Sequence, residues 1–170
     1  MEARALATLR RQADSARALM SAEQALDRVA AHGPSPWVSP FDHGSLAAEA
    51  SQCMQQLLKS TAARRHSEQV IQLRTGTHAR SRAFGQLRLA CILVSLGEVE
   101  QACAVAEAAL ASSDRLSSSR VLELCHTLHT QLQPHAYNPA VEPIAQSLSS
   151  ALATRAHCRL LITVVGNPER

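Results

Sequence analysis

Cysteine and histidine come close together in Cys125-His126-x-x-His129, the one cluster whose residue types suggest a metal site. On a helix, Cys125 and His129 are four residues apart and share a face, and such a pair can hold a zinc ion. A zinc site needs three or four ligands, and His135 lies beyond the helix-breaking Pro134. We therefore interpret the cluster as a core cysteine with two histidines at its rim, and we expect no metal and no cofactor.

Sequence motifs of catalysis are absent from the chain. It has no nucleophile-elbow serine, no zinc-protease helix and no Gly-rich phosphate or dinucleotide loop. Charged residues that resemble acid–base or phosphate-binding groups fit solvated helix faces and helix ends instead. These residues are Glu98, Glu100, Glu107, Arg115 and Arg120. The sequence therefore predicts that the protein is not an enzyme.

The basic residues are mostly arginines and are spread among nearly as many acids, so that the net charge is only +3. Arg80, Arg82 and Arg88 form the densest basic group. Aromatic residues do not alternate with them, as they do in proteins that bind single-stranded nucleic acid. We interpret the three arginines as a salt-bridged surface and expect no direct binding of nucleic acid.

Five scattered cysteines, with no C-x-x-C pair, do not make a disulfide framework and favour a reducing compartment. The first residues lack the apolar core of a secretory signal. The longest apolar stretches, LACILV (89–94) and LLITVV (160–165), are far too short to span a bilayer. A cytoplasmic protein without a membrane segment is therefore expected.

Composition favours helices, because 46% of the 170 residues are hydrophobic but only 2% are aromatic. Apolar residues recur at helical spacing in about seven segments, which Pro and Gly separate. The sequence predicts an all-α domain over 1–153, with helices over 1–32, 42–58, 60–74, 79–96, 99–112, 117–133 and 141–153. The β-prone tail over 154–170 is predicted to be non-helical or disordered.

Small residues recur with one spacing in three Ala-rich segments, and in the third a Leu-Gly-Glu turn (96–98) precedes them. Small side chains let antiparallel helices approach closely, and Gly97 permits a tight reversal. The segments are Ala18-Ala22-Ala25-Leu26, Ala63-Ser67-Val70-Ile71 and Ala102-Ala106-Ala109-Leu110. This frame resembles the tetratricopeptide repeat, which implies a right-handed superhelix of helical hairpins. Leu58 stands where the turn glycine of the preceding pair would be, and the first of the three units is expected to be incomplete.

The stretch from about residue 16 to 152 also resembles the helical-repeat domain that follows the helix-turn-helix domain in transcription regulators of actinobacteria. The residues that carry this resemblance are SPWVSPFDHGSLAAEASQC (35–53), RSRAFGQLRLA (80–90), GEVEQACAVAEAAL (97–110) and SSSRVLELCHTLHTQLQPH (117–135). It implies a sensor or interaction module that binds a protein or peptide, with self-association also open. The DNA-binding domain of that family has no counterpart in residues 1–31. A truncated regulator fragment or a structural dimerisation unit is the alternative.

In tetratricopeptide arrays the first helix of each pair lines the concave groove, which this resemblance places on residues 42–58 and 80–96. Matching the repeat frame turns amide side chains of the first helix and mostly apolar side chains of the second toward the groove. They are Gln52, Gln55 and Gln56 with Ala48, and Phe84, Leu87 and Cys91 with Ser95. Such walls suit an uncharged or weakly polar peptide. The alternative is that Phe84, Leu87 and Cys91 are core residues covered by the helix over 117–133.

Trp37 and Phe41 lie in the proline-rich segment before the helix predicted over 42–58. Exposed aromatic side chains there would make a contact site, whereas buried ones would fill the gap between neighbouring repeats. We favour the second interpretation.

Overall fold

The computed structural model describes residues 2–32, 41–75, 78–111 and 118–165, with side chains given for 2–28, 41–75, 78–111 and 118–153. Every regular element in these ranges is a helix, as the composition predicts. The α-helices are α1 (Glu2–Thr8), α2 (Gln12–His32), α3 (His43–Gln56), α4 (Ser60–Leu73), α5 (Ala79–Ser95), α6 (Val99–Ala111), α7 (Ser119–Leu132) and α8 (Val141–Val165), with a short 3-10 helix η2 (Gln133–His135) before α8. None of the helices in the described part of the chain is both long and apolar enough to cross a membrane.

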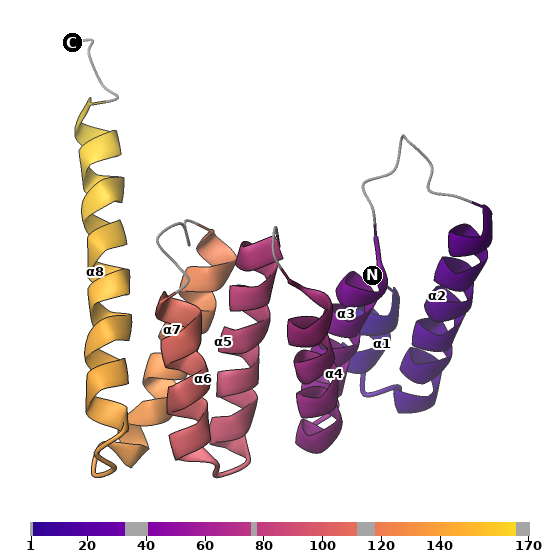
Figure 1. Ribbon diagram of the computed structural model, residues 1–170, viewed down its shortest axis with the longest axis horizontal. Helices are drawn as coiled ribbons and strands as arrows, with labels where there is room; N and C mark the ends of the chain where they lie inside the picture. The colour runs from indigo at the N-terminus through magenta and orange to yellow at the C-terminus, as the bar shows by residue number, and fades with distance from the viewer. Residues whose placement is uncertain (1, 33–40, 76–77, 112–117, 166–170) are drawn as a thin grey trace.

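Consecutive helices pair into four antiparallel hairpins, α1/α2, α3/α4, α5/α6 and α7/α8, which stand side by side in chain order (Figure 1). Neighbouring hairpins join through α1 and α2 against α3, α4 against α5, α5 against α7, and α6 against α8. The first helices of the hairpins therefore run parallel to one another. Their N-terminal ends lie at the same end of the molecule.

The first hairpin corrects the sequence prediction, which treated residues 1–32 as one helix in an incomplete unit. The chain reverses between α1 and α2 at Arg10, whose φ of 60° lies in the left-handed region. The hydroxyl of Ser15 on α2, which is fully buried, donates to the carbonyl of Ala3 on α1 at 2.9 Å. Because neither Gly nor Pro marks this turn, helical periodicity alone did not reveal it.

Three of the hairpins close with the same turn, centred on Arg10, Leu58 and Gly97. Each of these residues has a positive φ, of 60°, 60° and 82°. In each turn, the backbone N–H of the central residue donates to the carbonyl oxygen three positions earlier in the chain. The N–H of the residue after it donates to the carbonyl oxygen five positions earlier than itself. At Gly97 these bonds run from Gly97 to Val94 and from Glu98 to Leu93, at 3.0 and 2.9 Å. Leu58 thus adopts the backbone conformation of the turn glycine whose place it takes.

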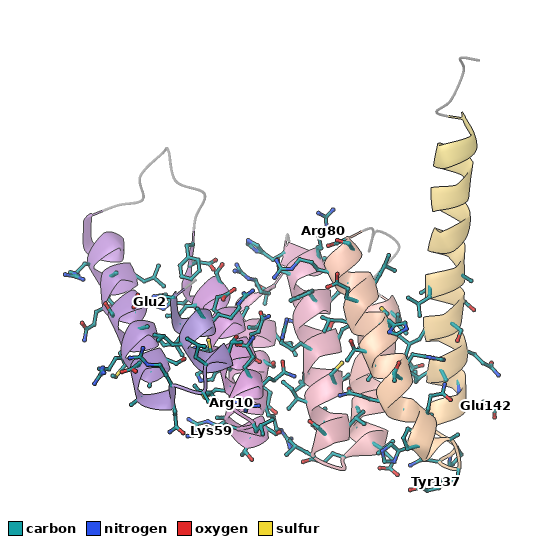
Figure 2. The ribbon with its side chains drawn as sticks, turned by 180° about the vertical axis from the view of Figure 1, so that it is seen from behind. Glu2, Arg10, Lys59, Arg80, Tyr137 and Glu142 are labelled. Atoms are coloured by element: carbon teal, nitrogen blue, oxygen red, sulfur yellow. The ribbon has the colours of Figure 1, made fainter. Side chains whose placement is uncertain are left out.

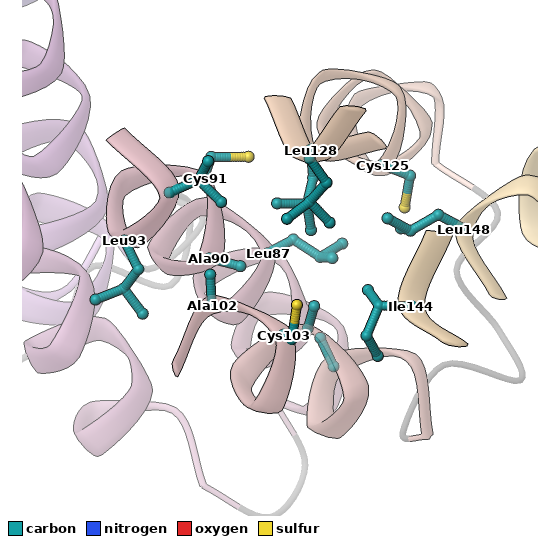
Figure 3. Close-up of a cluster of buried hydrophobic side chains, with 14 of the residues drawn as sticks. Leu87, Ala90, Cys91, Leu93, Ala102, Cys103, Cys125, Leu128, Ile144 and Leu148 are labelled. Carbon is teal, nitrogen blue, oxygen red and sulfur yellow. The ribbon is translucent and has the colours of Figure 1, made fainter. Parts of the chain in front are cut away.

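The largest hydrophobic core lies among α5, α6, α7 and α8 (Figure 3). Helix α5 packs against α4, α6 and α7, which explains why it is apolar on nearly every side. Its partner α6 contributes Ala102, Ala106 and Ala109, which are completely buried and let the two helices approach closely. Gly85 serves the same purpose toward α4, because a Cβ atom there would lie 2.8 Å from a methyl group of Val70.

The last helix is longer than the sequence predicts. Helix α8 begins at Val141 as expected, but it continues to Val165 and not only to Ala153. Its C-terminal half extends beyond the ends of the neighbouring helices (Figure 1). The segment LLITVV, which was expected to be non-helical, belongs to this helix, and residues 166–170 are outside the described ranges. The β propensity of a short apolar run is weak where a helix already leads into it.

Candidate binding groove

A cavity of about 400 Å³ opens where the N-terminal halves of α3 and α5 and the start of α7 meet. Its volume falls within the range of ligand pockets. Helix α4 closes it from one side. The lining residues are Phe41, Gly44, Ser45, Ala48, Glu49, Gln52, Val70, Arg74, Arg80, Ser81, Phe84, Ser118, Arg120 and Val121. We call this cavity the groove.

The α3 wall of the groove is fixed by an ion pair with the end of α4. Asp42 caps α3 by accepting a hydrogen bond from the backbone N–H of Ser45 at 2.8 Å. The same carboxylate holds both terminal nitrogens of Arg74 at 2.6 Å, in a bidentate pair. Gly44 allows this approach, because a Cβ atom there would lie 2.8 Å from the guanidinium carbon of Arg74.

Burial alone would raise the pKa of Asp42. The hydrogen bonds from Arg74 and Ser45 outweigh this effect and lower the pKa to about 2. The other carboxylate of the wall, Glu49, is held by Arg4 of α1, whose Nε donates to it at 3.1 Å. Both carboxylates of this wall are therefore already paired with arginine.

The α5 wall is built around Phe84, which is half-buried and packs on the edge of the core. The guanidinium carbons of Arg88 and Arg120 lie 5.1 and 5.5 Å from the centre of its ring. One turn below Phe84, Arg88 donates to the amide oxygen of Gln55 at 2.9 Å and so bridges α5 to α3. Arg88 is only 9% exposed, and burial lowers its pKa.

The groove contains more positive than negative charge. Arg80 and Arg120 are exposed at its rim, and neither forms an ion pair within the described residues. Arg80 lies at the end of the molecule where α5 and α7 begin (Figure 2). Because helix N-termini carry a partial positive charge, they add to the field of the arginines.

The residues expected to line a groove separate into two groups. Gln52 and Phe84 do line it, together with Ala48. Gln55 lies just below as the partner of Arg88, and the side-chain oxygen of Gln56 is buried with no hydrogen-bond partner within the described residues.

Leu87 and Cys91, by contrast, do not line an open surface. Leu87 is 0% exposed and Cys91 3% exposed, and the thiol of Cys91 lies 3.9 Å from the carbonyl oxygen of Leu124 on α7. Helix α7 covers both, as the alternative interpretation held (Figure 3). The prediction was wrong because the repeat frame was matched to the helices over 42–58 and 80–96 alone. It did not include the next hairpin, whose helix α7 packs on the face of α5 that carries Leu87 and Cys91.

The basic group Arg80, Arg82 and Arg88 does not form the salt-bridged surface that we expected. Arg80 is at the groove rim, and Arg88 is buried. Arg82 donates to the carbonyl oxygens of Ile71 and Arg74, at 2.6 and 3.2 Å, and so caps the end of α4. The three side chains therefore have three separate environments.

Other candidate residues take structural positions. Cys125 is buried, which raises the pKa of its thiol, and His129 lies within hydrogen-bond distance of Ser149, with the imidazole Nε2 3.1 Å from the hydroxyl. No cluster of three or more potential metal ligands occurs among the described residues. Glu98 pairs with Arg64 at 2.7 Å. Glu100 accepts from Asn138 at 2.5 Å.

Phe41 lines the mouth of the groove and is 48% exposed. Trp37 lies outside the described residues.

Sequence reasoning missed Arg74 and Arg120 as groove residues. Arg120 was assigned to a solvated face, and Arg74 was not singled out. The repeat frame did contain a signal for Arg120, because the first helices of stacked hairpins run parallel and bring the residues at their N-termini together.

Comparison of the chain with models of known protein families, with curated proteins and with solved structures gave no match.

Proposed function

We propose that this chain is a non-enzymatic, cytoplasmic helical-repeat module that binds a protein segment or peptide in the groove. By its resemblance to the repeat domains of transcription regulators, we assign it a sensor or interaction role. The observation that carries this proposal is the groove itself. It has the half-buried ring of Phe84 and two arginines without an ion pair among the described residues on one side, and an amide, Gln52, on the other.

A binding role fits the groove better than catalysis does. Its carboxylates, Asp42 with Arg74 and Glu49 with Arg4, are both held by arginine. A general base needs a pKa near the working pH, whereas the pKa of Asp42 is about 2. Nor do the hydroxyls of Ser45 and Ser81 have a histidine beside them in the groove lining.

The proposal can be tested by selecting peptides from a random library on the purified full chain and measuring their affinity by calorimetry. Gln52→Ala and Phe84→Ala should each weaken binding, and only Phe84→Ala should lower the melting temperature. Arg65→Gln, at an exposed position on α4, is the control and should bind as the wild type does.

The position of binding provides a second measurement. Amide shifts on adding a selected peptide should cluster on α3, α5 and the start of α7. Shifts confined to the outer helices α4 and α6, or no peptide enriched over beads without protein, would exclude the proposed function.

A further inference from the structure

Positive charge exceeds negative charge in the groove, because Arg74, Arg80 and Arg120 line it and Glu49 is the one carboxylate among its described lining residues. Arg120 and Arg80 lie at its rim, and Arg88 lies beneath the same Phe84 ring that Arg120 covers. The nearby carboxylates already have arginine partners, Glu49 with Arg4 and Asp42 with Arg74, and none of the described ion pairs includes Arg80 or Arg120.

The excess of positive charge has an energetic cost at Arg88, because this guanidinium is buried. A buried guanidinium has five N–H donors to satisfy, and here the described residues provide one partner, Gln55, while Nε is buried without any. Burial is the main cause that lowers the pKa of Arg88, and the like charge of Arg120 adds to this, while the Glu49 carboxylate acts against them with a smaller effect. Buried charges are ordinarily paired, so this arrangement is costly in the free protein and would be relieved by a nearby anion.

The groove also selects for apolar groups. Phe84, Ala48, Val121 and Phe41 share its surface with the arginines. A bare inorganic anion would neutralise the charge but leave this apolar surface in water. A peptide can satisfy both, because arginine forks bind carboxylates bidentately while a neighbouring apolar side chain covers the ring.

We infer that the groove binds an acidic peptide segment, with a carboxylate side chain between Arg80 and Arg120 and an adjacent apolar side chain against Phe84. This inference rests on the proposed function and specifies the ligand. It replaces the expectation of an uncharged peptide. That expectation followed from α3 and α5 alone and did not include the arginine that α7 brings to the groove.

The test uses the peptides selected on the full chain. Their mean content of Asp and Glu should exceed that of the starting library. For the tightest peptide, replacing each Asp by Asn and each Glu by Gln should weaken binding about tenfold or more. Arg80→Gln and Arg120→Gln should each weaken it about five- to tenfold, since an ionic hydrogen bond of that strength is lost. Both arginines are exposed, so these variants should melt like the wild type.

Arg65→Gln is the matched control, because it removes another exposed arginine, on α4 and outside the groove lining, and should leave affinity unchanged. Inorganic phosphate at the same concentration as the peptide should not displace it. Phosphate that competes as well as the peptide would show an anion site without peptide selectivity and would overturn the inference. Selected peptides that are neutral, and that bind in a Phe84-dependent manner unaffected by Arg120→Gln, would overturn the inference while leaving the proposed function intact.

Discussion

Arg88 is the residue at which we expect the stability of the fold and the proposed binding to oppose each other. It is 9% exposed, bonds only Gln55 among the described residues, and has no carboxylate partner there. Replacing such a buried charge by an apolar side chain of similar length is often neutral or stabilising. The hydrogen bond lost to Gln55 is compensated by water, since Gln55 is only half-buried.

We therefore expect Arg88→Met to keep or raise the free energy of unfolding, by up to about 2 kcal/mol, while it weakens binding of an acidic peptide. Chemical denaturation and calorimetry measure the two effects separately. A loss of more than about 2 kcal/mol would mean that Arg88 is a structural residue, and the argument from its missing counter-charge would fail.

Asp42, unlike Arg88, is expected to stabilise the fold, because its oppositely charged partner Arg74 is present. Its pKa in the folded protein is about 2, against about 4 in an unfolded chain. The stabilisation is therefore complete above about pH 4 and is lost as the pH falls toward 2. Since the Asp42 side chain is 45% exposed, solvent screening limits the effect to about 1 kcal/mol.

Asp42→Asn isolates this ion pair, because asparagine is an equally good helix N-cap. We expect a loss of about 1–2 kcal/mol at neutral pH, where the buried Arg74 remains without a carboxylate. Denaturation between pH 5 and pH 2 should show a smaller fall in stability for the variant than for the wild type. Parallel curves would contradict the assignment.

At the scale of elements, the three equivalent turns provide a direct test of backbone strain. Leu58 has a φ of 60° and is 75% exposed, so its side chain contributes little packing. Glycine occupies this region without the steric cost that a Cβ atom introduces.

Leu58→Gly should therefore raise stability by about 0.5–1 kcal/mol, which is unusual for a glycine introduced next to a helix. Gly97→Ala, in the equivalent turn, should lower it by about 1 kcal/mol, although a Cβ atom there would meet no neighbour within 4 Å. Thermal melts of both variants test the pair. A stability change of the same sign in both would show that the turns are not equivalent.

The contact between α5 and α6 is the part of the fold that the sequence predicts best. Because Ala106 is completely buried against α5, Ala106→Leu should overpack the contact and cost about 1–3 kcal/mol. Ala104→Leu, at an exposed position of the same helix, should change stability by less than about 0.5 kcal/mol. A melt unaffected by Ala106→Leu would refute the helix pairing.

These elements also show where sequence reasoning ends. The helices α3 to α7 were predictable within a few residues, because Pro, Gly and apolar spacing mark their ends. The break at Arg10 was not, because nothing in the residue type indicates a left-handed turn. For the groove, Gln52 and Phe84 were predictable from a repeat frame. Arg120 was not, because its position depends on how the fourth hairpin packs on the third.

At the scale of the whole molecule, hairpin stacking explains both the groove and the end of α8 that projects beyond the neighbouring helices (Figure 1). Parallel first helices bring their N-termini to one end, where the groove forms. The last hairpin has no successor among the described residues to cover it. Its described core contacts, from Val141, Ile144 and Leu148, all precede Ala153.

Deletion of residues 154–170 should therefore leave cooperative unfolding intact, with a melting temperature within about 3 °C of the full chain. The helical signal in circular dichroism should nevertheless fall, because the deletion removes the helical backbone over 154–165. A deletion after Glu142 is the control: it removes Ile144 and Leu148 and should abolish the sharp transition. If deletion of residues 154–170 lowered the melting temperature by more than about 5 °C, the terminal half of α8 would have to pack on the core or on a second copy of the chain. Light scattering before and after the deletion separates these two cases. If copies of the chain associate through this segment, the molar mass in solution is a multiple of the mass of one chain before the deletion and falls to that of one chain after it.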